Sequence, residues 1–222
     1  MDRDKLLDAA LVHVPFDGWT EATFRAAVAD SGADPVVARG VFPRGALDLA
    51  LAYHRRGDDL MSERLADVDL GAMKIREKIT FAVRARLEVI EDRELVRRGL
   101  TLFSLPMHAA DGARALWGTA DLIWTAIGDS SEDVNWYTKR ATLSGVYSSV
   151  VLYWLGDDTP GNEATWAFLD RRIEDVMRIE KVKARIRTNA LLKPLMAGPT
   201  WLAARIKAPK PAGNDLPGRW RR

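Results

Sequence analysis

The chain has 222 residues, of which 47% are hydrophobic and 29% charged, and its formal net charge is +2. This composition excludes disorder over most of the chain, because a disordered chain lacks the apolar area that offsets the entropy of ordering. The lack of cysteine in the sequence excludes disulfides, cysteine-ligated zinc, iron–sulfur clusters and thiol nucleophiles.

Membrane-spanning and targeting segments are not expected. No apolar run approaches the roughly 20 residues of a spanning helix. The start, Met-Asp-Arg-Asp-Lys, is acidic where secretory and mitochondrial leaders are basic, so no leader is predicted.

The first 60 residues predict three short helices. An apolar stripe indicates a helix over residues 4–14 that ends at Pro15. Thr20 is the expected N-cap of a second helix, and Asp34-Pro35 is the expected start of a third. The glycine-containing turn between the second and third helices gives a helix-turn-helix layout, which raises the possibility of DNA binding.

The residue types in this unit argue against DNA reading. The third helix offers Arg39 as its one long basic side chain and has no Ser, Thr, Asn or Gln to reach base edges. Residues 1–60 contain 7 basic and 10 acidic residues, so they repel rather than neutralise phosphates. We therefore predict an architectural three-helix unit and no nucleic-acid partner.

Helical periodicity continues through the middle of the chain. A fourth amphipathic helix is expected to end near Gly57. From residue 71 to 185 the apolar stripes predict one antiparallel bundle, in which Leu87 is buried and Arg86 points to solvent. No alternating strand pattern occurs, so the fold is predicted to be all-α.

The helix expected from Asp133 to Leu155 has two unlike faces. It is either an ordinary core helix packed on both sides, or its large face lines an apolar cavity while its small face packs on a neighbouring helix or a second subunit. The large residues are Trp136, Leu143, Tyr147, Val150 and Trp154, and the small ones are Thr138, Ala141, Thr142, Gly145, Ser148 and Ser149.

The C-terminal segment differs from the body. Residues 181–222 carry a net charge of +10, so the remaining residues carry −8, and five of the ten prolines fall in the last 29 residues. Either an amphipathic piece over 191–207 docks on its own domain, or it lies in a membrane interface, which the charge and the prolines favour. Gly198-Pro199 should kink it. The expected membrane-binding residues are Leu191, Leu195, Trp201, Leu202, Arg205, Ile206 and Lys207.

Catalytic signatures are lacking in the sequence. His13, His54 and His108 have no partners at metal-ligand spacing, and no Glu-x-x-His pair occurs for a di-iron centre. No dinucleotide, P-loop or Gly-x-Ser-x-Gly motif is present. We expect no enzyme activity, no cofactor and no metal.

One long stretch resembles the accessory family of ubiquinone biosynthesis known as the ninth COQ protein. The resemblance is sharp over residues 117–177 and diffuse before them. It is carried by Asp121-Leu122-Ile123-Trp124, by Gly128-Asp129, by the run Asp-Val-Asn-Trp-Tyr-Thr-Lys-Arg-Ala-Thr-Leu at 133–143, and by Thr-Trp-Ala-Phe-Leu-Asp-Arg-Arg-Ile at 165–173.

The resemblance implies a TetR-related fold, a homodimer and a non-catalytic role. It further implies an isoprenoid or quinone lipid held in an apolar cavity, docking on the di-iron demethoxyubiquinone hydroxylase, and a last amphipathic helix that binds membrane. The implied location is the bacterial cytoplasm, peripheral to the inner membrane, or the matrix side for a processed mitochondrial form. The implied hydroxylase-binding residues are Asp121, Leu122, Trp136, Tyr137 and Arg140.

The sequence thus predicts three regions: a helix-turn-helix-like unit over 1–60, a lipid-binding and dimerisation bundle over 61–187, and a basic amphipathic tail over 188–222. A TetR-type ligand-responsive repressor and a purely structural subunit without ligand are the alternatives. The lipid-binding residues expected from periodicity are Ile79, Val83, Leu87, Leu116, Ile123, Trp124 and Tyr147.

Overall fold

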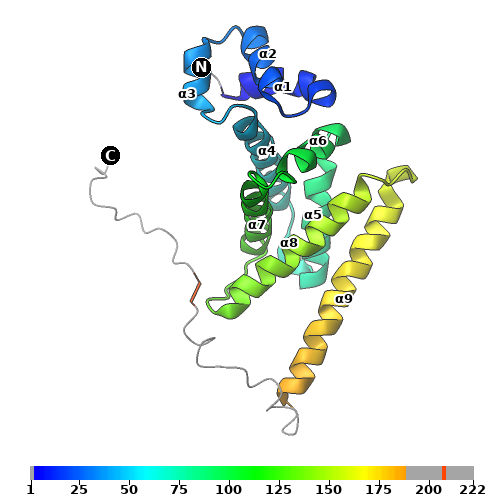
Figure 1. The fold of residues 1–222 in the computed structure, drawn as a ribbon. Coiled ribbons are helices and arrows are strands. Elements are labelled where there is room, and N and C mark those ends of the chain that lie inside the picture. Colours follow the sequence, from blue (N-terminus) through cyan, green and yellow to red (C-terminus); the bar gives the residue numbers. More distant parts are fainter. Residues whose placement is uncertain (1–2, 189–206, 209–222) are drawn as a thin grey trace.

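The computed structural model describes residues 3–188 and 207–208 (Figure 1), and all regular structure within them is helical, which confirms the all-α prediction. None of these helices is long and apolar enough to cross a membrane. The elements in order are α1 (Arg3–Asp17), α2 (Glu21–Ser31), α3 (Pro35–Val41), α4 (Ala46–Ala66), η1 (Leu70–Ala72), α5 (Ile75–Glu88), α6 (Arg93–Phe103), α7 (Ala109–Ala126), α8 (Val134–Trp154), η2 (Pro160–Asn162) and α9 (Glu163–Thr188).

The starts of α2 and α3 confirm the caps that the sequence predicted. The hydroxyl of Thr20 accepts from the Thr23 amide at 3.3 Å, and the carboxylate of Asp34 accepts from the first amides of α3. Gly32 ends α2 in the left-handed conformation, with φ 66°. The predicted end of α1 at Pro15 is wrong: α1 continues to Asp17, because a proline in the last turn removes only one helical hydrogen bond.

Helix α4 joins two hydrophobic cores. Its first half packs with α1, α2 and α3, and its second half packs with α5, α7, α8 and α9. The predicted boundary at residue 60 therefore falls inside one continuous helix. The predicted end of this helix near Gly57 is wrong, and the helix runs to Ala66. Gly57 serves close packing instead, since a Cβ there would lie 2.5 Å from Arg86 Cζ.

Helix α5 buries part of its predicted stripe and also buries an arginine. Val83 and Leu87 are at most 1% exposed, as predicted. The prediction that Arg86 points to solvent is wrong: it is 4% exposed and its Nε donates to Asp58 Oδ1 at 2.7 Å. Periodicity alone missed this, because the neutralising carboxylate lies on another helix.

Helix α6 links the N-terminal unit to the body. Leu95 packs in the core of α1 to α4, and Val96 and Leu100 pack against the body core. The indole Nε1 of Trp19 donates to the Leu95 carbonyl at 3.1 Å. The two cores are thereby held against the same helix, which places a cavity between them.

Candidate ligand cavity and partner surface

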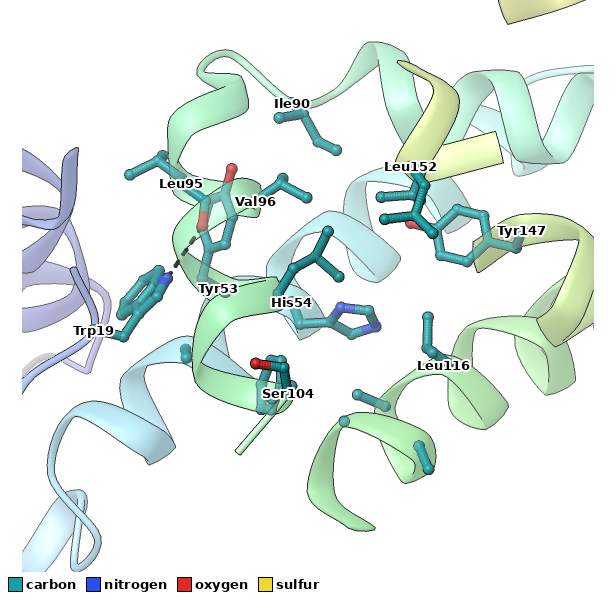
Figure 2. Close-up of a pocket in the computed structure, with 18 of the residues that line it drawn as sticks. Trp19, Tyr53, His54, Ile90, Leu95, Val96, Ser104, Leu116, Tyr147 and Leu152 are labelled. Atoms are coloured by element: carbon teal, nitrogen blue, oxygen red, sulfur yellow. Dashed lines mark hydrogen bonds between the residues drawn. The ribbon is translucent and has the colours of Figure 1, made fainter. Parts of the chain in front are cut away.

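A cavity of about 490 Å³ lies where α4, α6, α7 and α8 meet, here called the α6 cavity (Figure 2). Leu95, Val96 and Leu100 supply one wall, Leu116 of α7 supplies another, and Trp19 of the N-terminal unit closes a side. The volume falls within the range of about 300–1,000 Å³ typical of small-molecule sites. The apolar lining predicts that its occupant is largely hydrocarbon.

Three of the residues that line the α6 cavity are exposed to solvent: Ser104 in the turn between α6 and α7, Ala113 of α7 and Leu152 of α8. The turn itself carries Leu105, 46% exposed, and Met107, 78% exposed. Large apolar side chains are thus exposed next to Ser104, one of the residues that line the cavity.

Polar groups gather at the inner end of this cavity. Arg86 lines it while bonded to Asp58 and, through Nη2, to the His54 carbonyl at 2.9 Å. The His54 ring lies 2.8 Å from Thr119 Oγ1, which in turn donates to Asp58 Oδ1 at 2.9 Å. The carboxylate therefore compensates the guanidinium within a closed hydrogen-bond network.

Burial favours the neutral forms of three titratable side chains at this end, His54, Tyr53 and Tyr147. It lowers the pKa of His54, so the ring favours the neutral form. It raises the pKa of Tyr53 to about 12 and also raises the pKa of Tyr147. With Arg86 already paired to Asp58, the inner end has no uncompensated charge. That environment suits an uncharged ligand head better than a carboxylate or a phosphate.

Two phenol hydroxyls at this end form no hydrogen bond among the described residues. No hydrogen bond involves the hydroxyl of Tyr147, which is 4% exposed, or that of Tyr53. Figure 2 shows both side chains at the cavity, on opposite sides of His54. Each hydroxyl is therefore a donor available to an oxygen acceptor on a ligand in the cavity.

A second cavity of about 370 Å³, here called the α9 cavity, lies among α5, α7, α8 and α9. Ile173 and Met177 of α9 and Val146 of α8 contribute apolar walls. The indole Nε1 of Trp124, also on its wall, is buried without a hydrogen-bond partner among the described residues. Among all the residues that the structure describes, no group of three His, Asp or Glu side chains is arranged to hold a metal.

The predicted lipid-binding residues are divided among three places. Leu116 and Tyr147 line the α6 cavity, and Ile79 and Trp124 line the α9 cavity. The other three, Val83, Leu87 and Ile123, are buried in the body core and line neither. Periodicity identifies buried positions but does not tell a packed position from one that faces a void. It therefore missed Tyr53, whose cavity position depends on α6.

The residues that the resemblance assigns to the hydroxylase come from α7 and α8. Arg140 is buried and bonded through Nε to Asp121 Oδ1 at 2.5 Å. Its guanidinium lies 3.9 Å from the centre of the Trp136 ring. Tyr137 packs edge-on against Trp136, with ring centres 4.8 Å apart. Leu122, 40% exposed, follows Asp121 on α7.

A buried ion cluster fixes this surface. Arg140 Nη1 also donates to Asp129 Oδ2 at 3.1 Å, and Lys139 Nζ donates to Asp129 Oδ1 at 2.6 Å. The side chains of Arg140 and Asp129 are each 3% exposed. Arg140 thus holds Trp136 and Asp121 in place from below the surface.

Of the predicted membrane-binding residues, only Lys207 is among those that the structure describes. The other six lie outside them: Leu191, Leu195, Trp201, Leu202, Arg205 and Ile206.

The N-terminal unit carries two features that bear on DNA binding. The side chain of Arg39 pairs with Glu21 and stacks over the Phe24 ring at 4.3 Å, so it is committed within the unit. The exposed side chains beside it on α3 are apolar, with Val36 80% and Val37 49% exposed. Both features fit the predicted architectural role, and DNA binding stays untested.

Comparison with known proteins agrees with the sequence resemblance. Residues 109–180 match the COQ9 family model. The chain is 32% identical over 183 residues to the mitochondrial ubiquinone biosynthesis protein COQ9 of Drosophila melanogaster, covering 80% of this chain and 56% of that protein. It is 30% identical over 202 residues to the human protein of that name, covering 86% and 63%. The chain thus spans about three fifths of the curated relatives that it matches.

The comparison of structures identifies the fold. A TetR transcriptional regulator from Nitrosomonas europaea superposes with a TM-score of 0.64 at 17% identity, covering 78% of this chain and 95% of that one. The TetR-like fold prediction is therefore confirmed. At this identity the likeness concerns the fold alone and does not extend to the regulator's activity.

Proposed function

Because this chain resembles the COQ9 proteins over about four fifths of its length and matches their family model at residues 109–180, we propose that it is an accessory protein of ubiquinone biosynthesis. In this proposal it is not an enzyme. It takes a polyprenylated quinone precursor of the demethoxyubiquinone type from the membrane and presents it to the di-iron hydroxylase.

The α6 cavity is the observation that carries the proposal. A polyprenyl tail is too insoluble to cross water by itself, so a carrier must enclose it in an apolar space. The cavity supplies about 490 Å³ of such space. Its inner end supplies the phenols of Tyr53 and Tyr147, which suit the oxygen atoms of an uncharged quinone ring.

Delivery requires contact with both a membrane and a partner. The basic segment 191–207 and the exposed Leu105 and Met107 in the turn after α6 support a membrane contact. The aromatic surface around Trp136 and Tyr137 supports docking of the hydroxylase, since interfaces favour aromatic anchors. The chain then acts peripherally at a membrane, in a bacterial cytoplasm or on the matrix side of a mitochondrion.

The small-residue face of α8 supports a homodimer. Ala141, Thr142 and Gly145 are exposed along it, and small side chains allow a second backbone to approach closely.

The test is mass spectrometry of lipid that purifies with the chain under mild conditions. We expect an isoprenoid quinone or its precursor in the wild type. Ala113→Trp should remove it by filling the mouth of the α6 cavity. Val176→Trp, a matched change at the α9 cavity, should keep it.

Two results would overturn the proposal. A lipid-free spectrum from several preparations would contradict the carrier role and leave a structural subunit. Sequence-selective, salt-sensitive gel shifts with genomic fragments would instead favour the repressor alternative.

A further inference from the structure

Lys207 and Ala208 lie against the start of α8, as Figure 1 shows by their orange trace beside that helix. The hydroxyl of Tyr137 donates to the Lys207 carbonyl at 3.2 Å. The amide of Ala208 donates to the Glu132 carbonyl at 2.9 Å. Two backbone groups of the tail are therefore held next to each other by one side chain and one main-chain oxygen of the body.

The surface at this point is aromatic and acidic. The Trp117 ring centre lies 5.8 Å from that of Trp136 and 6.3 Å from that of Tyr137. Glu132 and Asp133 are exposed beside them. We call these five residues the aromatic patch. Aromatic surfaces of this kind take extended, proline-rich segments, because such segments lose little entropy on binding.

The sequence around the bound pair matches that preference. Residues 207–211 read Lys-Ala-Pro-Lys-Pro, so the pair belongs to a segment rich in proline and lysine. A residue that precedes proline, as Ala208 does, is biased towards extended backbone. The lysines are complementary in charge to Glu132 and Asp133.

The chain length permits this contact within one molecule. Eighteen residues separate Thr188 at the end of α9 from Lys207. An extended chain of that length reaches about 60 Å, so the linker does not limit where the segment binds.

We propose that the aromatic patch is a docking site for an extended lysine- and proline-rich segment, and that its occupant is the chain's own segment around Lys207 and Ala208. The docked segment covers Tyr137, so another protein that uses Tyr137 must first displace it. That consequence for the hydroxylase rests on the proposed function, whereas the docking does not.

A spin label tests the docking in the full chain. The wild-type sequence has no cysteine, so Ala212→Cys provides one labelling site. With ¹⁵N-labelled tryptophan, we expect the label to broaden the indole N–H signals of Trp117 and Trp136 and to leave that of Trp19 sharp. Adding Ala208→Pro removes the amide that donates to Glu132, and the broadening should fall at least twofold.

Ala208→Gly is the matched control, because it keeps the amide and should retain more of the broadening than Ala208→Pro. Unchanged Trp117 and Trp136 signals would overturn the proposal, as would equal broadening with Ala208→Pro. A ¹⁵N chain without the spin label can be mixed with a spin-labelled chain. Broadening of its Trp117 and Trp136 signals in that mixture would overturn the assignment to the same molecule. If the hydroxylase bound neither the wild type nor the variants, that result would count against the proposed function and not against the docking.

Discussion

Arg86 shows how one buried charge organises the centre of the molecule. Its side chain is 5% exposed and that of its partner Asp58 is 6% exposed. Bonds to the His54 carbonyl and to Asp58 tie α5 to α4. A buried pair contributes little net stability when intact, but loss of one partner strands the other charge.

Replacing Arg86 should therefore destabilise the fold strongly. We expect Arg86→Met to reduce the free energy of unfolding by about 3–5 kcal/mol, measured by urea denaturation. Arg84→Met is the control, because the Arg84–Glu88 pair is at the surface and is worth less than about 1 kcal/mol. Similar losses for the two variants would contradict the role given to Arg86.

His54 predicts a dependence of stability on acid. Burial lowers its pKa in the folded state below the ordinary value of 6.5. As the pH falls through that ordinary value, the unfolded chain takes up the proton first, so the free energy of unfolding decreases. His54→Gln should show a shallower decrease between about pH 7 and pH 5.5. Parallel curves for the variant and the wild type would contradict this.

Tyr147 predicts a hydroxyl contribution to ligand affinity. We expect Tyr147→Phe to weaken binding of a short-chain quinone about threefold to tenfold, measured by tryptophan fluorescence titration, because one hydrogen bond is lost while the ring remains. Tyr153→Phe is the control, since Tyr153 stacks on Phe168 and does not line the α6 cavity. Equal affinities for all three chains would show that the phenol makes no bond to the ligand.

At the scale of elements, the close contact between α4 and α5 depends on Gly57, because glycine has no side chain. Alanine is the better helix former by about 1 kcal/mol, so propensity alone predicts that Gly57→Ala stabilises. A Cβ at this position would meet the buried Arg86 guanidinium at 2.5 Å from Cζ. We expect a net loss of about 1–3 kcal/mol in thermal or urea unfolding.

Gly118 of α7 is the matched position for this test. A Cβ there would have no atom within 4 Å, so Gly118→Ala should stabilise by about 0.5–1 kcal/mol. A stabilising effect at both glycines would contradict the packing between Gly57 and Arg86.

The sequence predicted helices well where local chemistry determines them. Thr20 and Asp34 each start a helix through their own side-chain oxygen, which is a signal within three residues. It failed where a distant group decides. Gly57 looked like a helix end, and Arg86 looked like a surface residue, because each depends on the other across 28 residues or more.

The candidate site was predictable only in part for the same reason. Buried positions follow from the apolar period of one helix. All the predicted lipid-binding residues except Leu116 and Trp124 are in fact buried. A cavity is bounded by several helices at once, so its walls depend on how α6 crosses the body. The sequence carried no expectation for α6, and without it Tyr53 and Val96 could not be placed on a ligand site.

At the scale of the whole molecule, the proposed homodimer makes a prediction about mass. We expect sedimentation at twice the chain mass of 24.7 kDa. Gly145→Arg should shift it to the mass of one chain, because a long charged side chain blocks close approach along α8. Gly40→Arg, at an exposed glycine of α3, should leave the mass unchanged. A single-chain mass for the wild type would contradict the dimer.

Trp19 belongs to the N-terminal unit and is also a wall of the α6 cavity, anchored to α6 through the Leu95 carbonyl. A lipid that filled the cavity, as proposed, would pack against this indole, so its binding and the packing of the first three helices would be thermodynamically linked. Amides of α1 and α2 should then exchange more slowly with deuterium when the cavity is filled. The three N-terminal helices, which have a helix-turn-helix layout, would in this way report whether a lipid occupies the cavity.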